Sequence, residues 1–347
     1  MTVSKQPQSK TFRLERWIDM ARRGWYFGET HVHWRIAELP NVMPAEDLNV
    51  AFPVTFWTIE ALASPGLEPS PLRRQGLSPF GQREDRGHDP THVIFPRNTE
   101  YEIFSVGGKR HVLGSVFILN HKFVFRQGMP PIADQAHREG ALLDLDKHNW
   151  PWSMMLVPIA KVDLYELANN SVCRTNFSFR NSLVAPTTYM NVEADAGGMT
   201  EWGWLNFGFE NYYTLLKCGF RLQPTTGTAS GVHPVPLCYG RVCVRLGDRF
   251  DPQGWIDGLR RGNSFVTTGP MLLAKVNGCY PGYVFRHSGT RAHRYRLQLE
   301  SISSQLLDRI EIVVNGRMHK TIEPRPARSE APVRNRPYDT VGHDDSD

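Results

Sequence analysis

Residues 24–34 have the sequence GWYFGETHVHW, in which aromatic and β-branched residues predict a strand. His31 and His33 lie two positions apart on this strand, so their side chains point to the same face. Two imidazoles on one face can bind a single metal ion, and zinc, manganese and iron all accept imidazole ligands. Paired histidines on a strand also occur as ordinary packed or exposed residues, so further ligands must come from other elements.

A β-hairpin is predicted at residues 100–126, where two strand-like segments flank Gly107-Gly108. Two consecutive glycines favour a tight turn of the primed type. A two-residue loop of this kind places Phe104 opposite His111. Glu102 lies two residues from Phe104 and shares its face, which makes it the diagonal neighbour of His111 at about 7–8 Å.

Glu102 and His111 are therefore expected to complete the metal site that His31 and His33 begin. Glu100 shares the face of Glu102 and can take its place. Taken alone, the hairpin favours a simpler interpretation, in which the carboxylate and the imidazole form a charge pair that faces solvent.

Three further residues are candidates to move protons in catalysis. His148 follows a strand expected at 141–145. Glu166 lies near the end of a strand expected at 162–167, where it also fits the role of a carboxylate behind a metal ligand. His233 lies in a loop rich in glycine and threonine, and loops that follow strands often carry function. His148 also fits a structural role in capping its own loop.

Two residues are candidates to contact a small-molecule substrate. Arg35 follows the histidine strand and can hold an anionic group with two parallel hydrogen bonds. Trp150 lies beside His148 and can form the wall of a pocket, although it equally fits an ordinary core aromatic residue.

Strands that alternate with helices up to residue 268 predict a mostly parallel sheet or a barrel. Helices are expected at 131–139, 204–218 and 253–261. After residue 266 strands follow one another without helices, and Asn315-Gly316 predicts a type I′ hairpin turn.

The expected organisation is a lead-in at 1–24, a barrel at 25–268, a small sandwich-like β-domain at 269–322 and a disordered tail at 323–347. An irregular loop is expected at 64–92.

Composition narrows the function classes. The chain has 347 residues, 40% of them hydrophobic, which is enough for a large core. The net charge is +5, but the basic residues are scattered, which favours an ordinary solvated surface over nucleic-acid binding. Five cysteines without a C-x-x-C pair argue against a disulfide framework or a zinc ribbon.

No apolar stretch is long enough to span a membrane, and none resembles a signal peptide. We therefore expect a cytoplasmic protein, although a truncated secreted form also fits.

The order of these motifs resembles the PHP (polymerase and histidinol phosphatase) superfamily, and most closely its CehA/McbA-like metallohydrolases. The segments that carry the match are GWYFGETHVH, KHNW, VDLYELAN, GFRLQPTTGTASG, GRVCVRL and SFVTTGP, within residues 12–320. The resemblance implies a distorted (β/α)₇ barrel that binds divalent metals and hydrolyses ester, amide, carbamate or phosphoester bonds. It places metal ligands at His31, His33, Glu102, His111, His148 and His233.

The chain departs from the family pattern in two places. Thr55-Phe56-Trp57 stands where the superfamily usually has T-D-H, and Gly227-Thr228-Ala229-Ser230 stands where it usually has G-S-D-x-H. The remaining ligands predict one or two divalent ions per chain. The expected function is that of a metal-dependent hydrolase. The alternative is a degenerate barrel that binds a ligand such as a carbohydrate without turnover.

Overall fold

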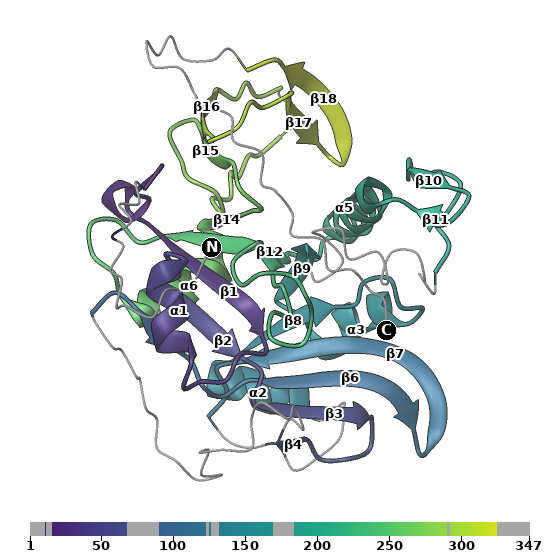
Figure 1. The fold of residues 1–347 in the computed structure, drawn as a ribbon. Coiled ribbons are helices and arrows are strands. Elements are labelled where there is room, and N and C mark those ends of the chain that lie inside the picture. The colour runs from purple at the N-terminus through teal and green to yellow at the C-terminus, as the bar shows by residue number, and fades with distance from the viewer. Residues whose placement is uncertain are drawn as a thin grey trace, which may run out of the picture.

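The computed structural model describes residues 11, 16–67, 90–122, 125, 132–168, 184–289 and 292–324 (Figure 1). Most of the expected loop at 64–92 and nearly all of the expected tail at 323–347 lie outside these residues. The described chain forms a mixed α/β structure with two large sheets. Its helices are η1 (Ala21–Arg23), α1 (Leu39–Ala45), α2 (Ile132–Glu139), α3 (Ser153–Ala160), α5 (Glu201–Lys217) and α6 (Pro252–Arg261).

The first sheet has five strands in the order β14-β13-β1-β2-β5. They are β14 (Ser264–Thr267), β13 (Arg241–Arg245), β1 (Trp25–Val32), β2 (Val50–Pro53) and β5 (Val93–Ile94). Strand β1 runs parallel to β2 and antiparallel to β13. All eight residues of β1 are buried, as expected for a central strand covered on both faces.

The second sheet has seven strands in the order β12-β9-β8-β7-β6-β3-β4. They are β12 (Gln223–Thr226), β9 (Leu164–Ala168), β8 (Leu142–Asp146), β7 (Lys109–Leu119), β6 (Thr99–Val106), β3 (Phe56–Glu60) and β4 (Gly66–Leu67). Strands β8, β9 and β12 are parallel, whereas the long β6–β7 hairpin is antiparallel and pairs with β8. The sheet is therefore mixed rather than mostly parallel, because the hairpin lies in its middle.

Capping side chains mark where α5 and α6 begin. Helix α6 begins after Asp251, whose side chain accepts a hydrogen bond from Gly254 N, and ends at Gly262 with φ +75°. Helix α5 begins after Thr200, which caps Gly203 N in the same way. The three helices expected from the sequence at 131–139, 204–218 and 253–261 are confirmed, with ends shifted by at most a few residues.

The second sheet separates an apolar core from polar residues. On β8, Leu143 and Leu145 belong to the core cluster that includes residues of α2 and α3. Asp144 and Asp146 alternate with these leucines and therefore point to the opposite face. Strands β8 and β9 are parallel, so carboxylates near their C-terminal ends lie at the same edge of the sheet.

The two large sheets meet beside the end of β1. Ala229 N donates to His31 O at 3.0 Å, and His33 N donates to Ser230 O at 2.8 Å. The segment after β12, from the second sheet, thus hydrogen-bonds to the histidine strand of the first. Within the described residues the strands form two separate sheets, and hydrogen bonding does not close them into one barrel.

Four strands gather at one end of the molecule (Figure 1): β15 (Met271–Val276), β16 (Leu297–Ile302), β17 (Ile310–Val314) and β18 (Arg317–Ile322). They form two antiparallel pairs, β15–β16 and β17–β18. Asn315 and Gly316 join β17 to β18 with φ values of 54° and 68°, which confirms the type I′ turn. A short pair, β10 (Ala194–Asp195) and β11 (Gly198–Met199), precedes α5.

The close approach of α6 to β1 yields a stability prediction. A Cβ atom on Gly28 would lie 2.3 Å from the ring of Trp255, whose Nε1 donates to Tyr26 O at 3.0 Å. We expect Gly28→Ala to lower the free energy of unfolding by about 1–3 kcal/mol through overpacking. Gly66→Ala is the matched control, because no atom lies within 4 Å of its added Cβ. Urea unfolding measures both, and equal stability of the two variants would contradict the prediction.

Candidate metal centre

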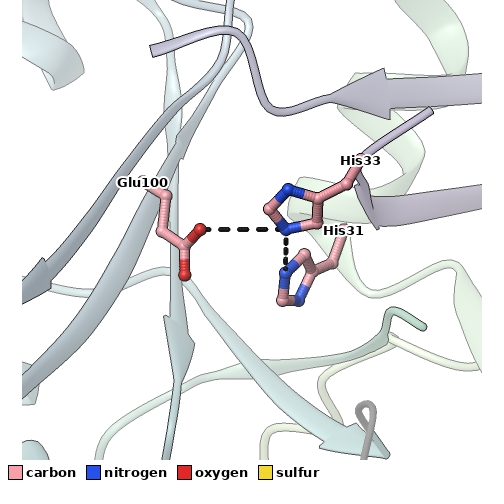
Figure 2. Close-up of side chains that lie close together, drawn as sticks. All are labelled: His31, His33 and Glu100. Atoms are coloured by element: carbon pink, nitrogen blue, oxygen red, sulfur yellow. Dashed lines mark hydrogen bonds and ion pairs between the residues drawn. The ribbon is translucent and has the colours of Figure 1, made fainter. Parts of the chain in front are cut away.

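The candidate centre begins at the C-terminal end of β1, where His31 and His33 are almost completely buried. Their Nε2 atoms lie 3.1 Å apart (Figure 2). Two imidazoles that bind one zinc ion at about 2.0–2.1 Å in tetrahedral geometry have nitrogens about 3.3 Å apart. The distance between the two Nε2 atoms is therefore close to the one that a shared ion requires.

Glu100 approaches the histidines from β6, in the other large sheet (Figure 2). Its Oε2 atom lies 3.9 Å from His33 Nε2. One ligand atom from each of His31, His33 and Glu100 lies within 4.8 Å of the other two. These three residues form a group that could hold a metal ion, and its carboxylate is the one that the strand pattern allowed in place of Glu102.

A second possible ligand group joins His31 to Asp146 and Glu166, again with ligand atoms within 4.8 Å of one another. His31 Nδ1 lies 3.3 Å from Glu166 Oε1, whereas His31 Nε2 faces His33. Glu166 Oε2 is also buried and lies 3.3 Å from the same Nδ1. A neutral His31 ring presents its lone pair through one nitrogen only, so it can bind a metal ion in one of the two groups at a time.

The protonation of these groups suits metal binding. Burial lowers the pKa of His31 well below its usual value, and the neighbouring His33 and Lys147 lower it further. A neutral imidazole keeps a lone pair for a metal ion. The pKa of Glu166 shifts the other way, raised by burial and then by the carboxylates of Asp146 and Asp144. Carboxylates crowded in this way favour a cation among them.

We call the four buried carboxylates of this region the acidic cluster: Glu100, Asp144, Asp146 and Glu166. Burial raises the pKa of Asp144 to about 8, although a hydrogen bond from the Thr225 hydroxyl opposes the shift. Buried carboxylates without a counter-charge cost several kcal/mol each, so their burial together requires nearby positive charge or bound protons.

Lys147 brings one positive charge to the acidic cluster. Its Nζ contacts Asp146 Oδ2 directly and lies 3.7 Å from Glu100 Oε1. Burial by itself lowers the pKa of Lys147, but the carboxylates of Asp146, Glu102 and Glu100 raise it well above its usual value. The ammonium is therefore charged, yet its single charge balances at most one of the four carboxylates.

The predicted pairing of Phe104 with His111 is wrong. Ile103 pairs with Gly114 and Ser105 with Arg110, so three residues of β7 bulge opposite Phe104. Glu102 consequently faces Ser115, four residues along the chain from His111. Neither Glu102 nor His111 belongs to a possible ligand group among the described residues.

Glu102 and His111 have other neighbours. Glu102 accepts a hydrogen bond from Trp57 Nε1 at 3.3 Å, and its Oε1 lies 3.6 Å from Lys147 Nζ. The ring of His111 lies 5.9 Å from that of Trp152. Glu102 therefore borders the acidic cluster through Lys147.

His148 and His233 lie in different surroundings. The His148 ring packs against Tyr165, Trp204 and Phe207, with centroids 4.8–6.1 Å away. Burial lowers its pKa to about 4. Burial, followed by the charges on Lys147 and His33, also lowers the pKa of His233 to about 4, which places His233 within electrostatic reach of the candidate centre.

The two candidate substrate contacts have partners of their own. Arg35, in the loop after β1, forms an ion pair with Glu38. Its Nε is buried and makes no hydrogen bond with the described residues. Trp150 follows β8 and is buried, with its ring 4.8 Å from that of Phe104.

Glu29 ties the histidine strand to the loop that carries His233. Its Oε1 accepts a hydrogen bond from Thr228 N at 2.8 Å, and its Oε2 accepts one from Cys238 N at 2.7 Å. Burial raises the pKa of Glu29 to about 7, although these hydrogen bonds oppose the shift. Glu29 thus fixes both ends of the segment from Thr228 to Cys238 against β1.

Sequence reasoning missed Asp146, Lys147 and Glu29. The signal for the first lies in the pattern LLDLDK at 142–147, where two aspartates alternate with leucines in a strand with a core face. Charged residues in such a strand are rarely buried unless they are paired or bind a metal. Glu29 lies at an alternate position of the same strand as His31 and His33, so the strand pattern places all three side chains on one face. Glu29 could therefore have been included among the candidate residues.

Two comparisons with known proteins give no match. No protein-family model matches the chain, and no curated protein resembles it. In the described part of the chain no helix is both long and apolar enough to cross a membrane.

The role of Glu29 can be tested at pH 8, above its pKa of about 7. In Glu29→Gln the amide nitrogen must face one of the two backbone N–H donors, which leaves a buried donor unpaired. We expect the free energy of unfolding to fall by about 1–3 kcal/mol. Glu46→Gln, at an exposed position, is the control for the lost charge. An unchanged stability of Glu29→Gln would show that Glu29 does not anchor the loop.

Proposed function

We propose that this chain is a metal-dependent hydrolase that cleaves an ester, amide, carbamate or phosphoester bond. The observation that carries the proposal is the convergence of two buried imidazoles, 3.1 Å apart at Nε2, with the acidic cluster. We further propose that the two sheets represent a distorted (β/α)₇ barrel of the PHP type, close to the CehA/McbA-like enzymes. Strands β15–β18 would then form its small β-rich C-terminal domain.

The residues fit a divalent ion. His31, His33 and Glu100 supply two nitrogens and a carboxylate, a combination that zinc, manganese and iron accept. Asp146 and Glu166 supply further oxygens around His31. When bound, such an ion supplies Lewis-acid chemistry, because it lowers the pKa of water towards about 7 and polarises the bond to be cleaved.

The remaining polar residues take the other tasks of hydrolysis. We propose that His233 and Glu166 move protons. His233 follows the segment that hydrogen-bonds to the histidine strand, and Glu166 Oε1 lies 3.3 Å from His31 Nδ1. His148 was also a candidate, but its aromatic surroundings favour a packing role. Arg35, which is paired with Glu38, is proposed to bind an anionic group of a small-molecule substrate through its guanidinium, and Trp150, packed against Phe104, is proposed to form part of a pocket wall.

Metal content gives the first test of this function. We expect the purified protein to bind at least one divalent transition metal ion, and His31→Ala, His33→Ala and Glu100→Ala each to lose most of it, because each removes a ligand. His319→Ala, at an exposed position on β18, is the matched control. Elemental analysis measures all five proteins. A wild type that folds normally but takes up neither zinc nor manganese would defeat the proposal and favour the ligand-binding barrel without turnover.

Activity gives the second test. We expect the metal-loaded protein to hydrolyse at least one of a set of nitrophenyl esters, carbamates and phosphoesters, and a chelator to abolish the reaction reversibly. His233→Asn should keep its metal and lose about 10²–10⁴-fold in kcat, the usual contribution of a proton-transfer group. Loss of metal from His233→Asn would instead make His233 a ligand, and full activity would exclude it from proton transfer.

A further inference from the structure

Lys147 occupies an unusual position for a lysine. It follows β8 directly, has φ +53°, and has a side chain only 16% exposed. Lysine side chains are rarely buried unless they are paired, and a non-glycine residue with positive φ is uncommon. The burial is explained when the ammonium has a fixed partner inside the protein.

The partners of the ammonium are three carboxylates. Lys147 Nζ contacts Asp146 directly and lies 3.6 Å from Glu102 Oε1 and 3.7 Å from Glu100 Oε1. Three carboxylates around one point are the surroundings that a hard divalent cation prefers. In this chain the carboxylates surround an ammonium instead.

Glu100 links this position to the histidines. Its Oε1 faces Lys147 at 3.7 Å, and its Oε2 faces His33 Nε2 at 3.9 Å. A carboxylate that bridges two metal ions presents its oxygens in the same divided manner. Asp146 makes a similar link, because it contacts Lys147 and also belongs to the ligand group of His31 and Glu166. Lys147 therefore touches one carboxylate from each possible ligand group.

We propose that the Lys147 ammonium is a built-in substitute for a second metal ion, so that the centre holds a single divalent ion. In this role Lys147 is a positioning residue, which holds Glu100 and Asp146 in place and excludes a further cation by repulsion. The inference rests on the proposed function, because it assumes that His31, His33 and the acidic cluster bind one ion. Glu102 is held by Trp57 Nε1 as well as by Lys147, so protein donors already serve this carboxylate.

The test compares metal stoichiometry after saturation with manganese and removal of free metal. We expect one ion per chain in the wild type and two in Lys147→Met, which keeps an unbranched side chain without the charge. Lys161→Met is the matched control, because Lys161 has φ +52° and an exposed ion pair with Asp134. It should keep one ion. Electron paramagnetic resonance adds an independent readout, since two neighbouring manganese ions give a spin-coupled spectrum and one ion does not.

The outcomes separate the inference from the proposed function. A wild type without metal defeats the proposed function. A wild type with two coupled ions, or Lys147→Met that folds and still binds one, overturns the inference alone. If Lys147→Met does not fold, Lys147→Arg and the wild type decide: both retain a cation, so a single uncoupled ion in each supports the inference, and a second ion in either overturns it.

Discussion

The structure around the histidines depends on the balance of buried charge. Glu100, Asp144, Asp146 and Glu166 lie in the interior, where an uncompensated carboxylate costs several kcal/mol. Burial keeps the adjacent His31 ring neutral, so it supplies no positive charge to offset them. The charge of Lys147 offsets part of the cost, and raised pKa values of Asp144 and Glu166 offset more by retaining protons. Each of these features favours a cation among the carboxylates.

The fold assembles this region from both large sheets. The histidines come from β1 of the first sheet, and the carboxylates come from β6, β8 and β9 of the second. Two sets of hydrogen bonds join the sheets at this point. The chain after β12 pairs with the end of β1 through Ala229 and Ser230, and Glu29 binds the backbone N–H groups at Thr228 and Cys238. The ligand geometry therefore depends on a loop that supplies no member of either ligand group.

Local patterns predicted much of the fold and the proximity of the two histidines. Capping residues and glycines located α6, and turn residues located the hairpin at Asn315-Gly316. The spacing of His31 and His33 brought both imidazoles together. The carboxylate that lies next to the histidines was harder to predict. The register of the hairpin depends on a bulge at residues 111–113, and no turn residue indicates that bulge in the sequence. One such irregularity moved His111 away from Glu102. Asp146 and Lys147 required knowledge of which strands become neighbours, which no local pattern contains.

The neighbours of Glu102 show how the chain treats a carboxylate beside the centre. Trp57 comes from β3 and donates a hydrogen bond to Glu102, whereas Lys147 follows β8 and forms an ion pair with it at 3.6 Å. These two partners come from opposite sides of β6 in the sheet order. A carboxylate held by a neutral indole and an ammonium has less capacity left for a metal ion. Glu100, on the same strand and face, lies next to His33 and remains oriented towards the histidines. The two glutamates thus have different neighbours. Glu100 faces His33 in the candidate centre, and Glu102 contacts Lys147 beside it.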